Sequence, residues 1–137
     1  MPLSVLLVDD NRTFLRILTR YLSEQGEGTL SVVGSVIGGQ DAVAQAQRLN
    51  PDIILLDLAM PDVSGLALLP KLRKTLPDAI IIALTLMDPD SSRQATLEAG
   101  ADAFVSKTSL ERDLLPAIRR LAVREPGSGH ERMQPAD

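Results

Sequence analysis

A chain of 137 residues is long enough for one domain, and a composition that is 45% hydrophobic but only 2% aromatic makes its core aliphatic. The absence of cysteine excludes disulfides and thiolate metal sites, and the net charge of -4 argues against a nucleic-acid-binding surface. His130, the single histidine, falls in a polar tail, so histidine metal sites and histidine-dependent triads are also excluded. The first residues lack a basic region and a long apolar run, so we expect a soluble, cytoplasmic protein without a membrane segment.

Short runs rich in Val, Ile and Leu predict five strands, at residues 3–8, 30–36, 52–57, 79–85 and 103–106. Four of these runs are nearly continuous, which is typical of parallel strands covered on both faces. An apolar stripe in the first intervening segment predicts an amphipathic helix, and its members are Phe14, Ile17, Leu18, Tyr21 and Leu22. Further helices are predicted at about 39–49, 65–76, 91–99 and 109–123. The alternation indicates an α/β fold with a parallel sheet, right-handed crossovers and helices on both faces.

Pro70 and Pro116 fall within two of these predicted helices. A proline in mid-helix removes an amide donor and costs about 3 kcal/mol, so we expect kinks or late helix starts there. After Val123 the apolar periodicity stops. We therefore expect one domain over residues 1–123 and a disordered tail or linker stub over 124–137.

Polar side chains stand at the ends of four predicted strands: Asp9 and Asp10, then Asp57, Thr85 and Lys107. The carboxyl ends of parallel strands share one edge of a sheet, which is where ligands bind in such folds. Three carboxylates without histidine or cysteine form an oxygen-only site that suits Mg²⁺. Each residue alone has an ordinary reading as a turn, cap, strand or solvated residue, and their common placement is what favours a site.

Four stretches carry a resemblance to a known family: "LLVDDN", "IILLDLAMPDVSGL", "IIALT" and "GADAFVSK". Over residues 3–122 the chain resembles the receiver domain of two-component response regulators. The resemblance implies a flavodoxin-like, doubly wound (βα)5 sandwich whose five-stranded parallel sheet has the order 2-1-3-4-5. It also implies a phosphoprotein switch that assists its own phosphorylation and dephosphorylation and is not a turnover enzyme.

The resemblance further implies roles for single residues. Asp57 would accept a phosphoryl group from a phosphohistidine on a sensor histidine kinase or a phosphotransfer protein. Asp10 would bind Mg²⁺ directly and Asp9 mostly through water, with Asp57 and the backbone carbonyl of Ala59 as further ligands. Lys107 would pair with the phosphoryl oxygens.

The same resemblance assigns the conformational switch to two residues. Thr85 would donate its hydroxyl to the attached phosphate, and Phe104 would then change rotamer to fill the vacated space. The surface formed by the fourth helix, fifth strand and fifth helix would change with it and control a downstream protein or an output domain outside this chain. A homodimer through the fifth-helix face is an open alternative.

The sequence departs from the family pattern at two positions. Leu86 stands where a small residue usually follows the switch hydroxyl, and Thr108 stands where a proline joined by a cis bond often follows the lysine. A cis bond without proline costs about 2.5 to 4 kcal/mol, so we predict a trans bond at Thr108. Thr108 with Glu111, or Ser109 alone, is a candidate cap for the last helix.

Three alternative functions remain to be weighed. A pseudo-receiver that docks partners without phosphorylation is the leading alternative. An aspartate-nucleophile phosphatase is disfavoured because the position of its acid/base aspartate holds Ala59. A flavin-binding protein is disfavoured because carboxylates in the first strand-helix turn would repel a cofactor phosphate.

Overall fold

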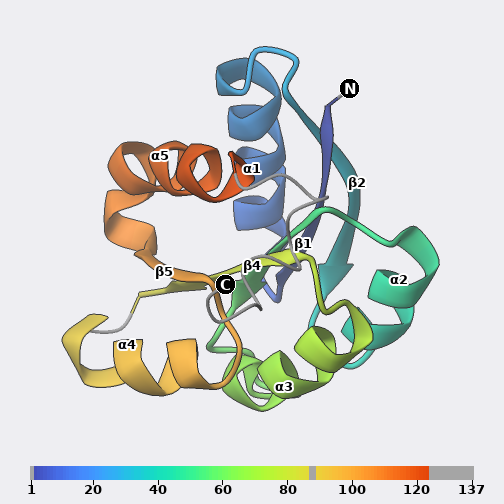
Figure 1. Ribbon diagram of the computed structural model, residues 1–137, viewed down its shortest axis with the longest axis vertical. Helices are drawn as coiled ribbons and strands as arrows, with labels where there is room; N and C mark the ends of the chain where they lie inside the picture. The colour runs from blue at the N-terminus through green and yellow to red at the C-terminus, as the bar shows by residue number, and fades with distance from the viewer. Residues whose placement is uncertain (1, 87–88, 124–137) are drawn as a thin grey trace.

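Five parallel strands form one sheet in the order β2-β1-β3-β4-β5, as the resemblance predicts (Figure 1). The structure is a computed structural model that describes residues 2–86 and 89–123. The strands are β1 (Leu3–Asp9), β2 (Leu30–Ile37), β3 (Ile53–Asp57), β4 (Ile80–Thr85) and β5 (Ala103–Ser106). The helices are α1 (Arg12–Gln25), α2 (Ala42–Leu49), α3 (Gly65–Thr75), α4 (Pro89–Glu98), the short 3-10 helix η1 (Lys107–Ser109) and α5 (Leu110–Ala122).

The sheet divides the hydrophobic core into two layers, and helices lie on both of its faces (Figure 1). Successive side chains of a strand point to opposite faces, so Val5 and Leu7 of β1 belong to one layer and Leu6 and Val8 to the other. Helices α1 and α5 cover the first layer, and α2 and α3 cover the second. The central strands are therefore buried on both faces, whereas the edge strand β2 alternates between buried and exposed positions.

The apolar stripe of α1 is shifted from its predicted position. Leu15, Leu18 and Leu22 are the buried residues of this helix, whereas Ile17 is 61% exposed. The prediction for Ile17 was wrong because the helix turns its Leu15 flank to the sheet and leaves Ile17 on the opposite flank of the stripe. Phe14 and Tyr21 are partly buried against the same layer.

Helices α3 and α5 run through Pro70 and Pro116, so the prediction of late helix starts was wrong. Both prolines are exposed, and water can satisfy the backbone carbonyl that each leaves without an intrahelical donor. Kinks at these positions stay a prediction. Helix α2 begins at Ala42, later than predicted, because residues 38–40 form a turn in which Gly38 has a φ of +89°.

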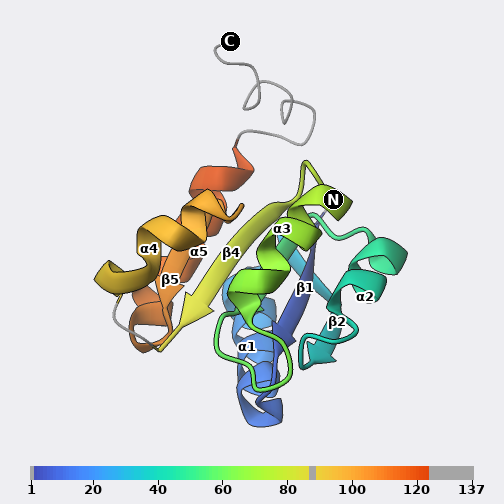
Figure 2. The ribbon, with the colours of Figure 1, turned by 90° about the horizontal axis from the view of Figure 1, so that it is seen from below.

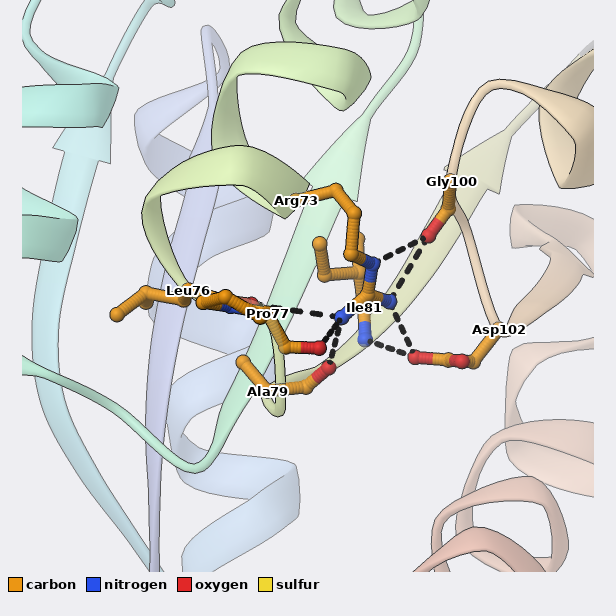
Figure 3. A network of polar contacts seen from close by, with 7 residues as sticks. All are labelled: Arg73, Leu76, Pro77, Ala79, Ile81, Gly100 and Asp102. Carbon is orange, nitrogen blue, oxygen red and sulfur yellow. Dashed lines mark hydrogen bonds and ion pairs between the residues drawn. The ribbon is translucent and has the colours of Figure 1, made fainter. Parts of the chain in front are cut away.

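Arg73 ties together the loops at the edge of the sheet where β4 and β5 begin (Figure 3). Its guanidinium donates to the carbonyl oxygens of Ala79 at 2.6 Å and Gly100 at 2.8 Å, and to Asp102 Oδ2 at 2.7 Å. The same Asp102 oxygen accepts the backbone amide of Ile81 at 2.9 Å. One side chain of α3 thereby fixes the starts of two neighbouring strands.

The described residues contain no helix that is long and apolar enough to span a membrane. The predicted tail, 124–137, and His130 within it lie outside the described residues.

Candidate functional site

The predicted site residues come together at the carboxyl-terminal edge of the sheet. Figure 2 shows the arrowheads of β1, β2 and β4 directed toward that edge. Asp9, Asp57 and Thr85 are the last residues of β1, β3 and β4, and Lys107 directly follows β5. Parallel strands thus deliver residues that are far apart in the sequence to one place.

Three carboxylates form the acidic side of the site. One oxygen of each of Asp9, Asp10 and Asp57 lies within 4.8 Å of the other two, a grouping that could hold a metal ion. Asp9 and Asp57 are each only 2% exposed, whereas Asp10 is exposed. Like charges at such a distance repel by roughly 4 kcal/mol per pair at an effective dielectric near 20, so positive charge is required here.

Lys107 supplies part of that positive charge. Its Nζ lies 2.8 Å from Asp9 Oδ2 and 3.3 Å from Asp57 Oδ1, and the side chain is 11% exposed. The ammonium also lies 4.4 Å from the centre of the Phe14 ring, a cation-π contact from α1. Three carboxylates and one ammonium leave two negative charges, and this oxygen donor set fits a divalent hard cation such as Mg²⁺.

Backbone amides orient the two buried carboxylates. Asn11 donates its amide to Asp9 Oδ1 at 2.9 Å, and Ala59 donates its amide to Asp57 Oδ1 at 3.1 Å. Asn11 also caps α1, because its side-chain oxygen accepts the amide of Phe14. The turn after β1 therefore starts the helix and fixes the acidic pair at the same time.

Burial raises the pKa of Asp57 above its usual value, and the nearby charge of Asp9 adds to the increase. The Ala59 amide and the Lys107 ammonium act in the opposite direction without cancelling the effect of burial. The negative charge of Asp57 is therefore incompletely compensated by the protein. A cation at this edge would stabilise the charged form.

Thr85 and Phe104 lie on neighbouring strands near this edge. Thr85 is fully buried and pairs with Ser106 in the β4–β5 register, two residues beyond the pair of Ala83 with Phe104. The Phe104 ring is buried in the core layer of α2 and α3, with the Arg93 guanidinium 5.5 Å from its centre. Thr85 and Phe104 thus lie on two strands that are paired with each other. Their role as a switch stays a prediction.

The two departures from the family pattern both lie at the rim. Leu86 is 70% exposed directly after Thr85. The described residues contain no cis peptide bond, so the trans bond predicted at Thr108 is confirmed.

Of the two predicted caps of the last helix, Ser109 is confirmed as the N-cap residue but makes no side-chain cap bond, and Thr108 lies within a preceding turn. A 3-10 turn precedes α5, and Ser106 caps that turn by accepting the amide of Thr108. Ser109 stands at the N-cap of α5, but its hydroxyl donates to Asp113 at 2.8 Å and its side chain accepts no cap bond.

Two contributors at the site were missed in the sequence. Phe14 was assigned only to the apolar stripe of the first helix. It follows Asp10 by four residues, and this short spacing could have placed it near the site. Asp62 was given no role and occurs only within the quoted stretch "IILLDLAMPDVSGL". Its carboxylate accepts the backbone amides of Gly39 and Gln40, and the Gly-Gly pair before α2 is the signal that could have identified a tight turn.

Comparison with known sequences agrees with this geometry. The sequence pattern of the response regulator receiver domain matches residues 5–119. The response regulator protein VraR of Staphylococcus saprophyticus is 36% identical over 120 residues, which are 88% of this chain and 56% of that protein. VraR of Staphylococcus aureus is 35% identical over 120 residues, which are again 88% of this chain and 56% of that protein. The chain thus spans about half the length of the curated relatives it matches.

Solved structures give the same likeness. A two-component response regulator of the LuxR family from Aurantimonas superposes with a TM-score of 0.81 at 25% identity, covering 89% of this chain and 86% of that one. The response regulator domain of Thermotoga maritima CheB superposes with a TM-score of 0.80 at 27% identity, covering 88% and 96%.

Proposed function

This chain belongs to the response regulator receiver domain family of two-component systems, and from that premise we propose that Asp57 is its phosphoryl acceptor. The observation that carries the proposal is the buried Asp57 carboxylate, which lies 3.3 Å from Lys107 and beside Asp9 and Asp10. Over residues 1–123, the proposed domain, this group of side chains combines a nucleophile with fixed positive charge.

Phosphoryl transfer to Asp57 depends mainly on how the reacting atoms are positioned. Oδ1 of Asp57 already accepts the Ala59 amide and pairs with Lys107, so we expect Oδ2 to attack the phosphorus. As the new O–P bond forms, the P–N bond of the donor phosphohistidine breaks and its electron pair stays on the imidazole nitrogen. Lys107 then moves part of its charge interaction from Asp9 to the phosphoryl oxygens.

The residues that would hold Mg²⁺ are Asp9, Asp10 and Asp57, together with the backbone carbonyl of Ala59. When bound, the ion neutralises charge on the phosphoryl oxygens and on the acidic group. The two negative charges left uncompensated at the site support this assignment, because they match the charge of the ion.

The switch that follows is assigned to Thr85 and Phe104. A phosphoryl group adds about 1.5 to 2 negative charges beside Asp9, which is enough to bias a loop with two conformations. Thr85 would turn its hydroxyl to the phosphate, and the ring of Phe104 would move into the space it leaves. The burial of both side chains on adjacent strands supports this coupling.

The partners follow from the same proposal. A sensor histidine kinase or a histidine phosphotransfer protein donates the phosphoryl group, and a downstream protein or an output domain outside this chain reads the switched surface. The cytoplasm is the proposed compartment, since these partners work there. A homodimer through the α5 face is one form that the switched state can take.

Intact mass after incubation with a small acyl-phosphate donor, with and without Mg²⁺, tests the proposal. We expect a Mg²⁺-dependent gain of one phosphoryl group that is lost in Asp57→Asn and kept in Asp41→Asn, whose side chain is exposed and makes no cap hydrogen bond. A folded native chain that gains no phosphoryl group under any of these conditions would contradict the proposal and favour docking without phosphorylation.

A further inference from the structure

A short turn, residues 38–40, connects two parts of the candidate site. At one end the amide of Gly38 donates to the backbone carbonyl of Asp9 at 2.9 Å. At the other end the amides of Gly39 and Gln40 donate to the carboxylate of Asp62. The turn therefore joins the acidic end of β1 to the β3–α3 loop, residues 58–64.

Both carboxylate oxygens of Asp62 accept hydrogen bonds from the turn. The Gly39 amide lies 3.1 Å from Oδ1 and 3.0 Å from Oδ2, and the Gln40 amide lies 3.1 Å from Oδ2. Oδ1 also accepts the amide of Val63 at 2.8 Å. These hydrogen bonds, that of Gly39 above all, lower the pKa of Asp62, so the carboxylate is charged at neutral pH.

The turn fits closely under the loop because Gly38 and Gly39 lack side chains. A Cβ on Gly38 would lie 2.9 Å from Asp62 Oδ2, and a Cβ on Gly39 would lie 2.8 Å from Leu68 and 3.0 Å from Val63. Real Cβ atoms essentially never approach closer than 3.0 Å, so the contacts with Asp62 and Leu68 would have to shift. The two glycines thus permit the contact, and Asp62 fixes it.

The ends of the loop are fixed by two backbone hydrogen bonds. The amide of Leu58 donates to the carbonyl of Leu84 at 3.1 Å, and the amide of Gly65 donates to the carbonyl of Leu58 at 3.1 Å. Ala59, the proposed carbonyl ligand, lies between Leu58 and Asp62 in the sequence. The amide of Ala59 donates to Asp57. A shift of the loop would therefore move the carbonyl of Ala59 relative to the three carboxylates.

We propose that Asp62 is a positioning residue that sets the affinity of the site for its divalent cation. Held on the turn, Asp62 fixes the distance between the Ala59 carbonyl and the acidic end of β1. The inference rests on the proposed function, because it requires Mg²⁺ at Asp9, Asp10 and Asp57. Asp62 itself is not a ligand in this proposal.

The test compares Asp62→Ala with Asp62→Asn and with the matched control Asp41→Ala. Asp41 lies beside the same turn, carries the same charge and makes no side-chain cap bond, so its removal takes away one negative charge near the turn without breaking such a bond. Binding of Mg²⁺ to each protein is measured directly by titration calorimetry. We expect Asp62→Ala to weaken binding about tenfold, the lower end of the range for residues that support metal ligands. We expect Asp62→Asn to lose less, because one oxygen acceptor remains.

A second measurement separates positioning from general loss of structure. The rate of phosphorylation by the acyl-phosphate donor is followed against Mg²⁺ concentration. We expect Asp62→Ala to raise the half-saturating concentration in proportion to the loss of binding and to keep the rate at saturation. A variant that only loosened the fold would lower the melting temperature in EDTA without changing that concentration.

The outcomes distinguish the two proposals. Failure of the native chain to bind Mg²⁺ would overturn the proposed function and the inference together. Normal binding by the native chain, with equal affinities for Asp62→Ala and Asp41→Ala, would overturn the inference alone. A loss of affinity in Asp62→Ala, partly restored in Asp62→Asn and absent in Asp41→Ala, would establish it.

Discussion

Lys107 lies closer to Asp9 than to Asp57: its Nζ is 2.8 Å from an oxygen of Asp9 and 3.3 Å from an oxygen of Asp57. The ammonium is therefore shared between a proposed metal ligand and the proposed acceptor. Each buried carboxylate depends on a cation that the other also uses. The stability of the site and its chemistry are linked through this one side chain.

Replacement of Lys107 by Met would leave Asp9 and Asp57 buried without their ammonium. We expect a loss of about 3 to 5 kcal/mol in the free energy of unfolding in EDTA, as when one partner of a buried pair is removed. Added Mg²⁺ should then raise the melting temperature more in this variant than in the native chain, because the ion becomes the main source of positive charge. Lys71→Met, at an exposed position of α3, is the control. Equal Mg²⁺-induced shifts in the variant and the native chain would contradict this account.

Replacement of Asp57 by Asn should stabilise the protein at neutral pH in EDTA. Because burial raises the pKa of Asp57, ionisation of this group costs the folded state free energy. The cost is complete above the folded-state pKa and vanishes below the ordinary value of 3.8. The melting temperature of the variant should therefore exceed that of the native chain most at neutral pH, with a difference that shrinks as the pH falls. A difference that grew on acidification would show the opposite sign of the shift.

Replacement of Gly65 by Ala should slow phosphorylation. A Cβ at Gly65 would overlap the backbone carbonyl of Asp57 and lie 2.6 Å from the Cα of Leu58, so the strand end that carries the proposed acceptor must move. We expect a loss of about 1 to 3 kcal/mol in stability, as for other overpacked sites. Gly28→Ala is the control, since it is strained by a φ of +83° yet meets no atom within 4 Å. Phosphorylation rates that fell equally in both variants would indicate a general effect of destabilisation.

Replacement of Arg73 by Ala should destabilise the fold without changing the phosphoryl site. The change removes the ion pair between Arg73 and Asp102 and a donor to the carbonyls of Ala79 and Gly100 (Figure 3). We expect a loss of about 3 kcal/mol by urea denaturation, against about 0.3 to 0.5 kcal/mol for Arg20→Ala, whose pair with Glu24 is exposed. A small effect of Arg73→Ala would show that water replaces the lost contacts.

The strand ends were the most predictable part of the site. A nearly continuous apolar run that stops at Asp9, Asp57 or Thr85 identifies both the strand and the residue at its carboxyl end. The rule that parallel strands share an edge then brings these residues together. The order of the strands, in contrast, came from the family resemblance, because periodicity alone does not fix which strands are neighbours.

The remaining errors have local causes. Whether Ile17 or Leu15 faces the sheet depends on how α1 is rotated, which the stripe defines only approximately. Pro70 and Pro116 are tolerated because they lie on exposed helix faces, and exposure is a property of the folded molecule. The contact of Asp62 with Gly39 joins two loops 23 residues apart, and no spacing rule predicts it.

The contact between Lys107 and Asp9 spans 98 residues, nearly the whole domain. During synthesis the amino-terminal strands leave the ribosome first, at about 5 to 20 residues per second, and Lys107 follows seconds later. A nascent chain that has not reached this residue would have to bury Asp9 and Asp57 without their ammonium. The residue that follows the last strand therefore balances the charge at the end of the first strand, so the charge of the acidic group stays unbalanced until nearly all of the domain has been synthesised.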